Sequence, residues 1–195
     1  MFKNVAHFLT LFRLFVGPIF LYIYSRPELL RLSPFYAYFM LLLLLVLSEA
    51  SDLLDGFMAR NFGKVTKFGK ILDPMADSIC RLSIFFTFTL PPVQLPLILV
   101  FMFLYRDMMI GALRTLVSLN GKALAARPSG KIKAVVQAVA LFGIVICLIL
   151  FSHEYINLSQ LQAISFWMAF VAAIYAVISG IEYIIAHLRH ILKLI

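Results

Sequence analysis

The chain has 195 residues, of which 63% are apolar and only 13% are charged, and its formal net charge is +8. Soluble domains have roughly 45–50% apolar and about 25% charged residues, so this composition excludes an ordinary water-soluble protein. Most of the positive charges lie near the ends of long apolar segments. This placement favours anionic lipid headgroups or phosphorylated substrates as partners, and not nucleic acid.

Six apolar segments are long enough to cross a membrane as helices, because a transmembrane helix needs about 20 mainly apolar residues. The segments cover residues 8–25, 33–60, 66–89, 92–119, 131–152 and 159–187. They leave no room for a separate soluble domain, so we expect residues 1–195 to form a single domain. The predicted fold is an all-α integral membrane protein, a bundle of six transmembrane helices.

The connections between these segments differ in charge, and short cytoplasmic loops carry most of the Lys and Arg residues of membrane proteins. Basic residues gather at the N-terminus, in the second and fourth connections and in the tail: Lys3, Arg13, Arg60, Lys64, Lys67, Lys70, Lys122, Arg127, Lys131, Lys133, Arg189 and Lys193. The third connection, residues 91–96, has no charge, and the fifth has only Glu154. The first connection fits this alternation least well, because its charges sum to +1. We expect both termini to be cytoplasmic.

Four carboxylates stand at the adjoining ends of the second and third segments: Asp52, Asp55, Asp73 and Asp77. With about 100° of rotation per helical residue, Asp52 and Asp55 are about 60° apart and Asp73 and Asp77 about 40° apart. Each pair shares a helix face, and antiparallel pairing of the two helices brings the pairs together. Crowded carboxylates at a membrane edge require a cation.

The chemistry of these carboxylates indicates which cation they bind. Oxygen ligands without nearby His or Cys indicate Mg²⁺ or Mn²⁺. Two ions about 3.5–4 Å apart would use four carboxylates and suit displacement at phosphorus. The sequence therefore predicts two divalent metal ions as cofactors.

Small residues continue the two acidic faces. Gly56 and Ala59 follow Asp52 by four and seven residues, and Gly69 precedes Asp73 by four. They indicate either close helix packing, which is common in membranes, or space for a ligand beside the metal ions. A cation-conducting membrane protein is an alternative, since intramembrane carboxylates also line ion pathways. That alternative explains the acids but not the glycines or Arg60.

The pattern from Asp52 to Asp77 is Asp-x-x-Asp-Gly-x-x-Ala-Arg, eight residues, then Gly-x-x-x-Asp-x-x-x-Asp. It resembles the signature of the CDP-alcohol phosphotransferases at every specified position. The resemblance implies six transmembrane helices, a homodimer, and two metal ions held by the four Asp residues against the diphosphate of a CDP-linked donor. Asp77 would also be the general base. The donor pocket would include Asp52, Gly56, Ala59, Arg60 and Gly69. The implied reaction is direct attack of an acceptor hydroxyl on the β-phosphorus, with CMP leaving.

A second group of charges lies in the fourth and fifth segments. Arg106 and Arg114 stand well inside an apolar helix, where arginine normally faces a partner or a cavity. Lys131 and Lys133 open the next helix. Together these four cations predict a pocket for an anionic group such as a phosphate. The alternative is that Arg106 pairs with Asp107 and that the lysines are membrane anchors.

The same stretch resembles a narrower group, the phosphatidylglycerophosphate synthases. The likeness rests on Arg106-Asp107, Arg114, Gly130-Lys131-Ile132-Lys133, Gln137, and an N-terminal segment with Asn4, Thr10 and Arg13. The sequence departs from that pattern at His7, Asp107 and Ala134.

The narrower likeness implies a donor and an acceptor. A phosphatidyl group would pass from CDP-diacylglycerol to sn-glycerol 3-phosphate, with Arg106, Arg114, Lys131 and Lys133 holding the acceptor phosphate. Other acceptors remain open, namely an inositol phosphate, or phosphatidylglycerol as in cardiolipin synthases. The expected location is a bacterial inner membrane, with the active site on the cytoplasmic side.

Overall fold

The structure is a computed structural model. It describes the backbone of residues 2–30, 33–62, 67–119 and 128–191. Side chains are described for residues 11–28, 33–52, 54, 74–117 and 128–187. The protein consists of six long helices and one short 3-10 helix, η1. Their bounds are α1 Phe2–Ser25, η1 Pro27–Leu30, α2 Pro34–Phe62, α3 Lys67–Thr87, α4 Leu97–Leu119, α5 Pro128–Ser152 and α6 Leu158–Ile191. Every element in the described residues is helical, so the all-α prediction is confirmed for them.

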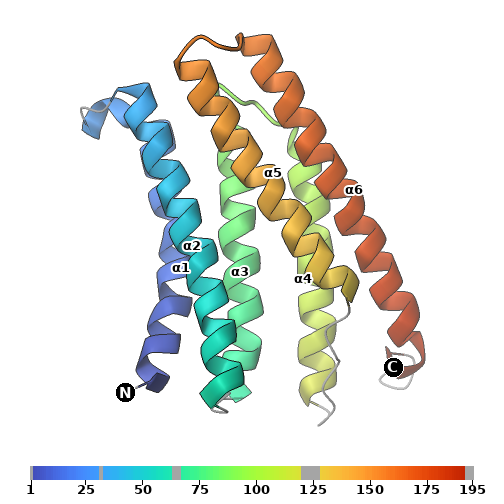
Figure 1. Cartoon of the computed structure of the whole chain (residues 1–195). Helices are drawn as coiled ribbons and strands as arrows, with labels where there is room; N and C mark the ends of the chain where they lie inside the picture. Colours follow the sequence, from blue (N-terminus) through green and yellow to red (C-terminus); the bar gives the residue numbers. More distant parts are fainter. Residues whose placement is uncertain (1, 31–32, 63–66, 120–127, 192–195) are drawn as a thin grey trace.

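The six helices run alternately up and down the bundle, as Figure 1 shows. The start of α1, the end of α6, and the ends of the helices that flank the second and fourth connections all lie at one end, the lower end of the figure. In space, α1 packs against α2 and α3, whereas α6 packs against α4 and α5. Contacts of α2 with α5 and of α3 with α4 join these two groups of three helices.

Prolines and capping residues determine where the helices begin. The predicted fourth segment began at residue 92, but α4 starts at Leu97, because Pro96 lacks an N–H and disfavours helix in the residue before it. Helix α6 begins after a reciprocal cap: the Gln160 N–H donates to Asn157 Oδ1 at 2.8 Å, and the Asn157 N–H donates to Gln160 Oε1 at 2.9 Å. This exchange satisfies backbone donors that the first turn leaves open.

Apolar side chains cover the outside of the bundle as well as its core. Phe20, Phe85 and Ile144 are completely buried, yet Tyr105 and Trp167 expose 69% and 61% of their surface. An apolar exterior of this kind suits lipid better than water.

Three helices have stretches long and apolar enough to span a membrane: Pro34–Asp52 of α2, Pro128–Ser152 of α5 and Leu158–His187 of α6. Within the described part of α1, the apolar stretch Leu11–Ser25 is shorter. The structure is therefore that of a helical membrane protein, while the predicted number of six spans is not established by helix length and composition.

Close helix contacts depend on glycines at a few positions. A Cβ at Gly17 of α1 would lie 2.6 Å from the Cβ of Ser83 in α3, and a Cβ at Gly180 of α6 would lie 2.9 Å from the Cγ of Arg106 in α4. The missing side chains let α1 approach α3, and α6 approach α4, at the level of charged groups inside the bundle.

Candidate active site

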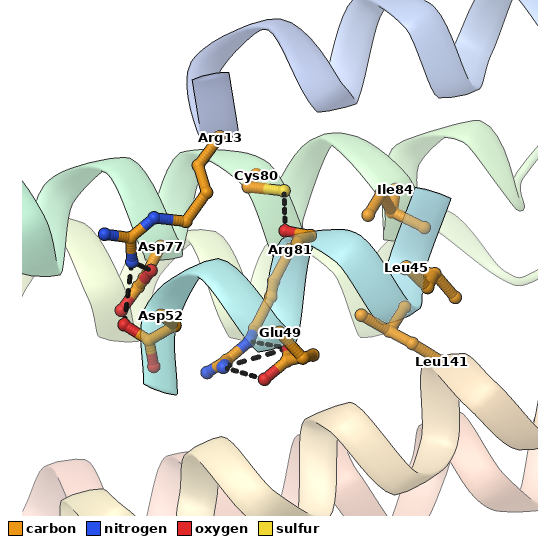
Figure 2. Close-up of a pocket in the computed structure, with 10 residues that line it drawn as sticks. Arg13, Leu45, Glu49, Asp52, Asp77, Cys80, Arg81, Ile84 and Leu141 are labelled. Atoms are coloured by element: carbon orange, nitrogen blue, oxygen red, sulfur yellow. Dashed lines mark hydrogen bonds and ion pairs between the residues drawn. The ribbon is translucent and has the colours of Figure 1, made fainter. Parts of the chain in front are cut away.

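An arginine joins three helices at the centre of the α1–α2–α3 group. Arg13 of α1 reaches between Asp52 of α2 and Asp77 of α3, as Figure 2 shows. Its Nη1 donates to Asp52 Oδ1 at 2.7 Å and also contacts Asp77 Oδ1. The arginine side chain is 1% exposed, whereas those of Asp52 and Asp77 are 38% and 25% exposed. The structure thus brings together two of the four predicted metal ligands from different helices.

A second ion pair lies one helical turn away and lines the same small pocket. Glu49 precedes Asp52 by three residues, and Arg81 follows Asp77 by four, so each shares a helix face with its neighbour. Arg81 Nη2 lies 3.1 Å from both carboxylate oxygens of Glu49, and its Nε lies 3.2 Å from Oε1. This pair fixes α2 against α3 beside the two aspartates (Figure 2).

The remaining predicted ligands and donor-pocket residues lie on further turns of the same two helices. Asp55, Gly56, Ala59 and Arg60 belong to α2, and Gly69 and Asp73 to α3. Their side chains lie outside the described residues. Within the described part of the chain, no group of three or more His, Cys, Asp or Glu residues is placed to hold a metal ion. The pair that is described, Asp52 with Asp77, offers only carboxylate oxygens, the ligand type that fits Mg²⁺ or Mn²⁺.

Two of the four predicted acceptor cations meet at one carboxylate between α4 and α5. Lys133 Nζ lies 2.7 and 2.8 Å from the two oxygens of Asp107, and Arg106 Nη1 lies 3.0 Å from Asp107 Oδ1. Arg106 also contacts Ser179 of α6, with 3.3 Å between Nη2 and Oγ. Pairing of Arg106 with Asp107, the alternative raised by the sequence, is therefore present in the structure.

The other two predicted cations lie apart from this carboxylate. Arg114 is two turns beyond Arg106 on α4, and its guanidinium carbon lies 5.3 Å from the ring centre of Tyr183, with Nε 3.4 Å from the phenol oxygen. Lys131 is exposed. It precedes Lys133 by two residues, so the two side chains point in directions about 160° apart around the axis of α5. The described contacts therefore group Arg106 and Lys133, with Arg114 further along the bundle and Lys131 on another face of α5.

Sequence reasoning missed several residues that line these sites. Arg13 was assigned only to the N-terminal pattern and to the membrane topology, although a charge inside an apolar helix normally faces a partner. Ser179 and Tyr183 of α6, which contact the two arginines of α4, were not singled out. Their spacing of four residues, which places both on one face of α6, was the available signal.

Comparisons with known proteins identify the family of the chain. The family model described as CDP-alcohol phosphatidyltransferase matches residues 3–178. The chain is 29% identical over 189 residues to a protein of Bacillus subtilis, with 92% of this chain and 93% of that protein covered. It is 28% identical over 192 residues to a protein of Haemophilus influenzae, with 93% and 91% covered. With a protein of Escherichia coli K12 it shares 32% identity over 149 residues, with 71% and 74% covered. All three relatives are named CDP-diacylglycerol–glycerol-3-phosphate 3-phosphatidyltransferase.

Proposed function

The chain belongs to the CDP-alcohol phosphatidyltransferase family, and from this premise we propose that it transfers a phosphatidyl group from CDP-diacylglycerol to sn-glycerol 3-phosphate, releasing CMP. The observation that carries the proposal is similarity over more than nine-tenths of the chain to relatives with that named activity. Family membership makes the protein a phosphatidyltransferase of phospholipid synthesis. The choice of glycerol 3-phosphate rests on the names of the relatives and on the cations of α4 and α5.

The donor would bind where α2 and α3 bring their acids together. Two divalent ions, Mg²⁺ or Mn²⁺, held by Asp52, Asp55, Asp73 and Asp77, would neutralise the diphosphate and make its β-phosphorus more electrophilic. The oxygen-only chemistry of the described pair, Asp52 and Asp77, fits such ions. Arg60 would hold the nucleotide, with Gly56, Ala59 and Gly69 leaving space for it.

The reaction itself needs one base and one well-placed alcohol. Asp77 would accept the proton of the acceptor hydroxyl as its oxygen attacks the β-phosphorus. The bond from the β-phosphorus to the oxygen that bridges the two phosphates breaks, and CMP leaves with that oxygen. The position of Asp77 supports this assignment, because its carboxylate lies at the face where α3 meets Asp52 of α2.

The acceptor phosphate would bind near the cations of α4 and α5. Asp107 offsets one of the three cations Arg106, Arg114 and Lys133, which leaves two positive charges. A phosphate monoester has a charge of about −1.5 to −2 at pH 7, so the balance is close to neutral.

Gln137, one turn after Lys133, is 2% exposed, and its Oε1 has no hydrogen-bond partner among the described residues. A hydroxyl of the acceptor would supply that donor. Lys131, which is exposed, would attract the phosphate from the surface.

The proposal extends to the membrane arrangement. All six helices would cross a bacterial inner membrane, with both termini and the active site on the cytoplasmic side, and residues 1–195 would act as one domain in a homodimer. The start of α1, the end of α6 and the helix ends that flank the second and fourth connections lie at one end of the bundle (Figure 1). This supports the topology, since the N-terminus, the tail and these two connections carry most of the Lys and Arg residues.

Release of CMP tests the function directly. Purified protein in detergent, supplied with CDP-diacylglycerol, glycerol 3-phosphate and Mg²⁺, should release CMP and form phosphatidylglycerophosphate. Inositol 1-phosphate, phosphatidylglycerol, serine and inositol, offered in parallel, identify the acceptor by relative rate. A faster reaction with inositol 1-phosphate or phosphatidylglycerol would retain the phosphotransferase and change its acceptor. Absence of CMP release with every acceptor would contradict the proposal and favour a cation-conducting protein.

A further inference from the structure

Arg13 contacts Asp52 and Asp77, two of the carboxylates that the proposed function assigns to a metal ion. Its guanidinium is buried and reaches Oδ1 of both carboxylates with a single nitrogen, Nη1. The arginine comes from α1, whereas the two acids come from α2 and α3. One positive charge therefore joins three helices at the point where the proposed function places a metal ion (Figure 2).

Electrostatics explains why a cation is required at this point when no metal is bound. Two carboxylates on neighbouring helices repel each other, and the repulsion grows as water is excluded. A guanidinium offsets it by charge and by charge-assisted hydrogen bonds. A divalent ion held by Asp52 and Asp77 would lie beside the Arg13 guanidinium, and the two cations would repel each other. The two cations therefore compete for the same pair of carboxylates.

We infer that Arg13 is the internal counter-ion of the metal-free site, and that it gives up Asp52 and Asp77 when a divalent cation binds between α2 and α3. The inference rests on the proposed function for the identity of the metal ligands. It makes Arg13 a positioning residue, which holds the carboxylates together before the metal arrives and lowers the apparent affinity of the site for metal.

The test measures metal binding without substrates. Mn²⁺ is titrated into the full-length protein in detergent, and free Mn²⁺ is followed by electron paramagnetic resonance. Arg13→Gln removes the competitor, so Mn²⁺ should bind about 10-fold or more tightly than in the wild type, as expected from loss of a charge-assisted contact. Arg26→Gln removes a charge from an exposed position just beyond α1 and should leave the affinity unchanged. Unchanged or weaker Mn²⁺ binding by Arg13→Gln would overturn the inference.

Thermal unfolding separates a counter-ion from a fixed structural contact. In EDTA, Arg13→Gln should unfold at a lower temperature than the wild type, because the two acids lose their only shared cation among the described residues. Saturating Mn²⁺ should close most of this difference, since the ion then serves as the counter-ion. An equal difference in EDTA and in Mn²⁺ would show that Arg13 is a fixed contact and would overturn the inference.

A milder variant covers the case in which Arg13→Gln does not fold. Arg13→Lys keeps the charge but loses the planar fork, so its contact with the two carboxylates is weaker and its Mn²⁺ affinity should be higher than that of the wild type. An affinity equal to that of the wild type, or lower, would overturn the inference. The outcome is independent of turnover: tighter Mn²⁺ binding by the variants without CMP release by the wild type would contradict the proposed function and leave the counter-ion role standing.

Discussion

Lys133 of α5 donates to both carboxylate oxygens of Asp107 of α4, at 2.7 and 2.8 Å, with both side chains buried. A lysine predicted to hold the acceptor phosphate is thus already engaged by an acid of the neighbouring helix. Arg106 shares the same acid. An incoming phosphate would therefore compete with Asp107, whose single negative charge is shared by Lys133 and Arg106.

Breaking this pair should destabilise the protein more than removing it as a unit. Asp107→Asn alone leaves the buried Lys133 without its carboxylate, which costs about 3–5 kcal/mol, whereas Lys133→Met alone should cost less, because Asp107 keeps its contact with Arg106. The double variant should lose clearly less than the sum of the two single losses, because the methionine fills the space of the lysine without a charge. Thermal unfolding in detergent measures all four proteins. Additive losses would show that the ion pair is not coupled.

Arg114→Ala should weaken the acceptor side of the reaction. Loss of a charge-assisted hydrogen bond predicts a roughly 10–150-fold lower kcat/KM for glycerol 3-phosphate, with little change in KM for CDP-diacylglycerol. Arg114→Lys should not restore the rate if the bidentate fork is needed. Tyr183→Phe is the matched control: it removes the hydroxyl near Arg114 but keeps the ring below the guanidinium, so its effect should be smaller. An equal loss for glycerol and glycerol 3-phosphate would contradict a phosphate-binding role.

Removal of divalent metal should abolish turnover reversibly. Asp52 and Asp77 offer only oxygen ligands, so EDTA should stop CMP release and Mg²⁺ or Mn²⁺ should restore it. The measurement is CMP release before chelation, after it and after addition of each ion. Full activity after exhaustive chelation would remove the two-metal proposal.

Asp77→Asn should reduce kcat by at least the roughly 10²–10⁴-fold typical of the loss of a general base. Binding of CDP-diacylglycerol should largely persist, because the other carboxylates remain. Glu49→Gln removes another acid from the same pocket and should reduce the rate less, since Glu49 pairs with Arg81 and has no assigned role in the chemistry. An Asp77→Asn enzyme with a rate near that of the wild type would exclude Asp77 as the base.

Gly17→Ala should destabilise the contact between α1 and α3, which positions Arg13. The new Cβ would lie 2.6 Å from the Cβ of Ser83, an atom that moves only with its backbone. Overpacking of this kind costs about 1–3 kcal/mol. Gly111→Ala is the control: a Cβ there meets no atom within 4 Å, and alanine favours the helix by about 0.5–1 kcal/mol. Thermal unfolding compares the two, and an equally stable Gly17→Ala protein would show that the helices can separate without loss.

The sequence alone was sufficient to predict the helices and the residues of the family pattern. Long apolar segments must form helices in lipid, because every backbone polar group has to be satisfied within its own segment. The predicted helix ends at Ser25 and Leu119 agree with the structure, whereas the start of α4 was predicted five residues too early, because the signal of Pro96 was missed. Asp52 and Asp77 stand at the adjoining ends of two consecutive helices, so the sequence also predicted that their carboxylates lie close together.

Only the tertiary structure decided which polar groups became partners. Arg13 is 39 and 64 residues from the two acids that it contacts, and Asp107 is paired with Lys133, 26 residues away. Such pairs depend on the rotation and height of each helix against its neighbours. Rotation and height are determined by close contacts between helices, such as that of Gly17 with Ser83. The periodicity of residues within one helix does not predict such contacts.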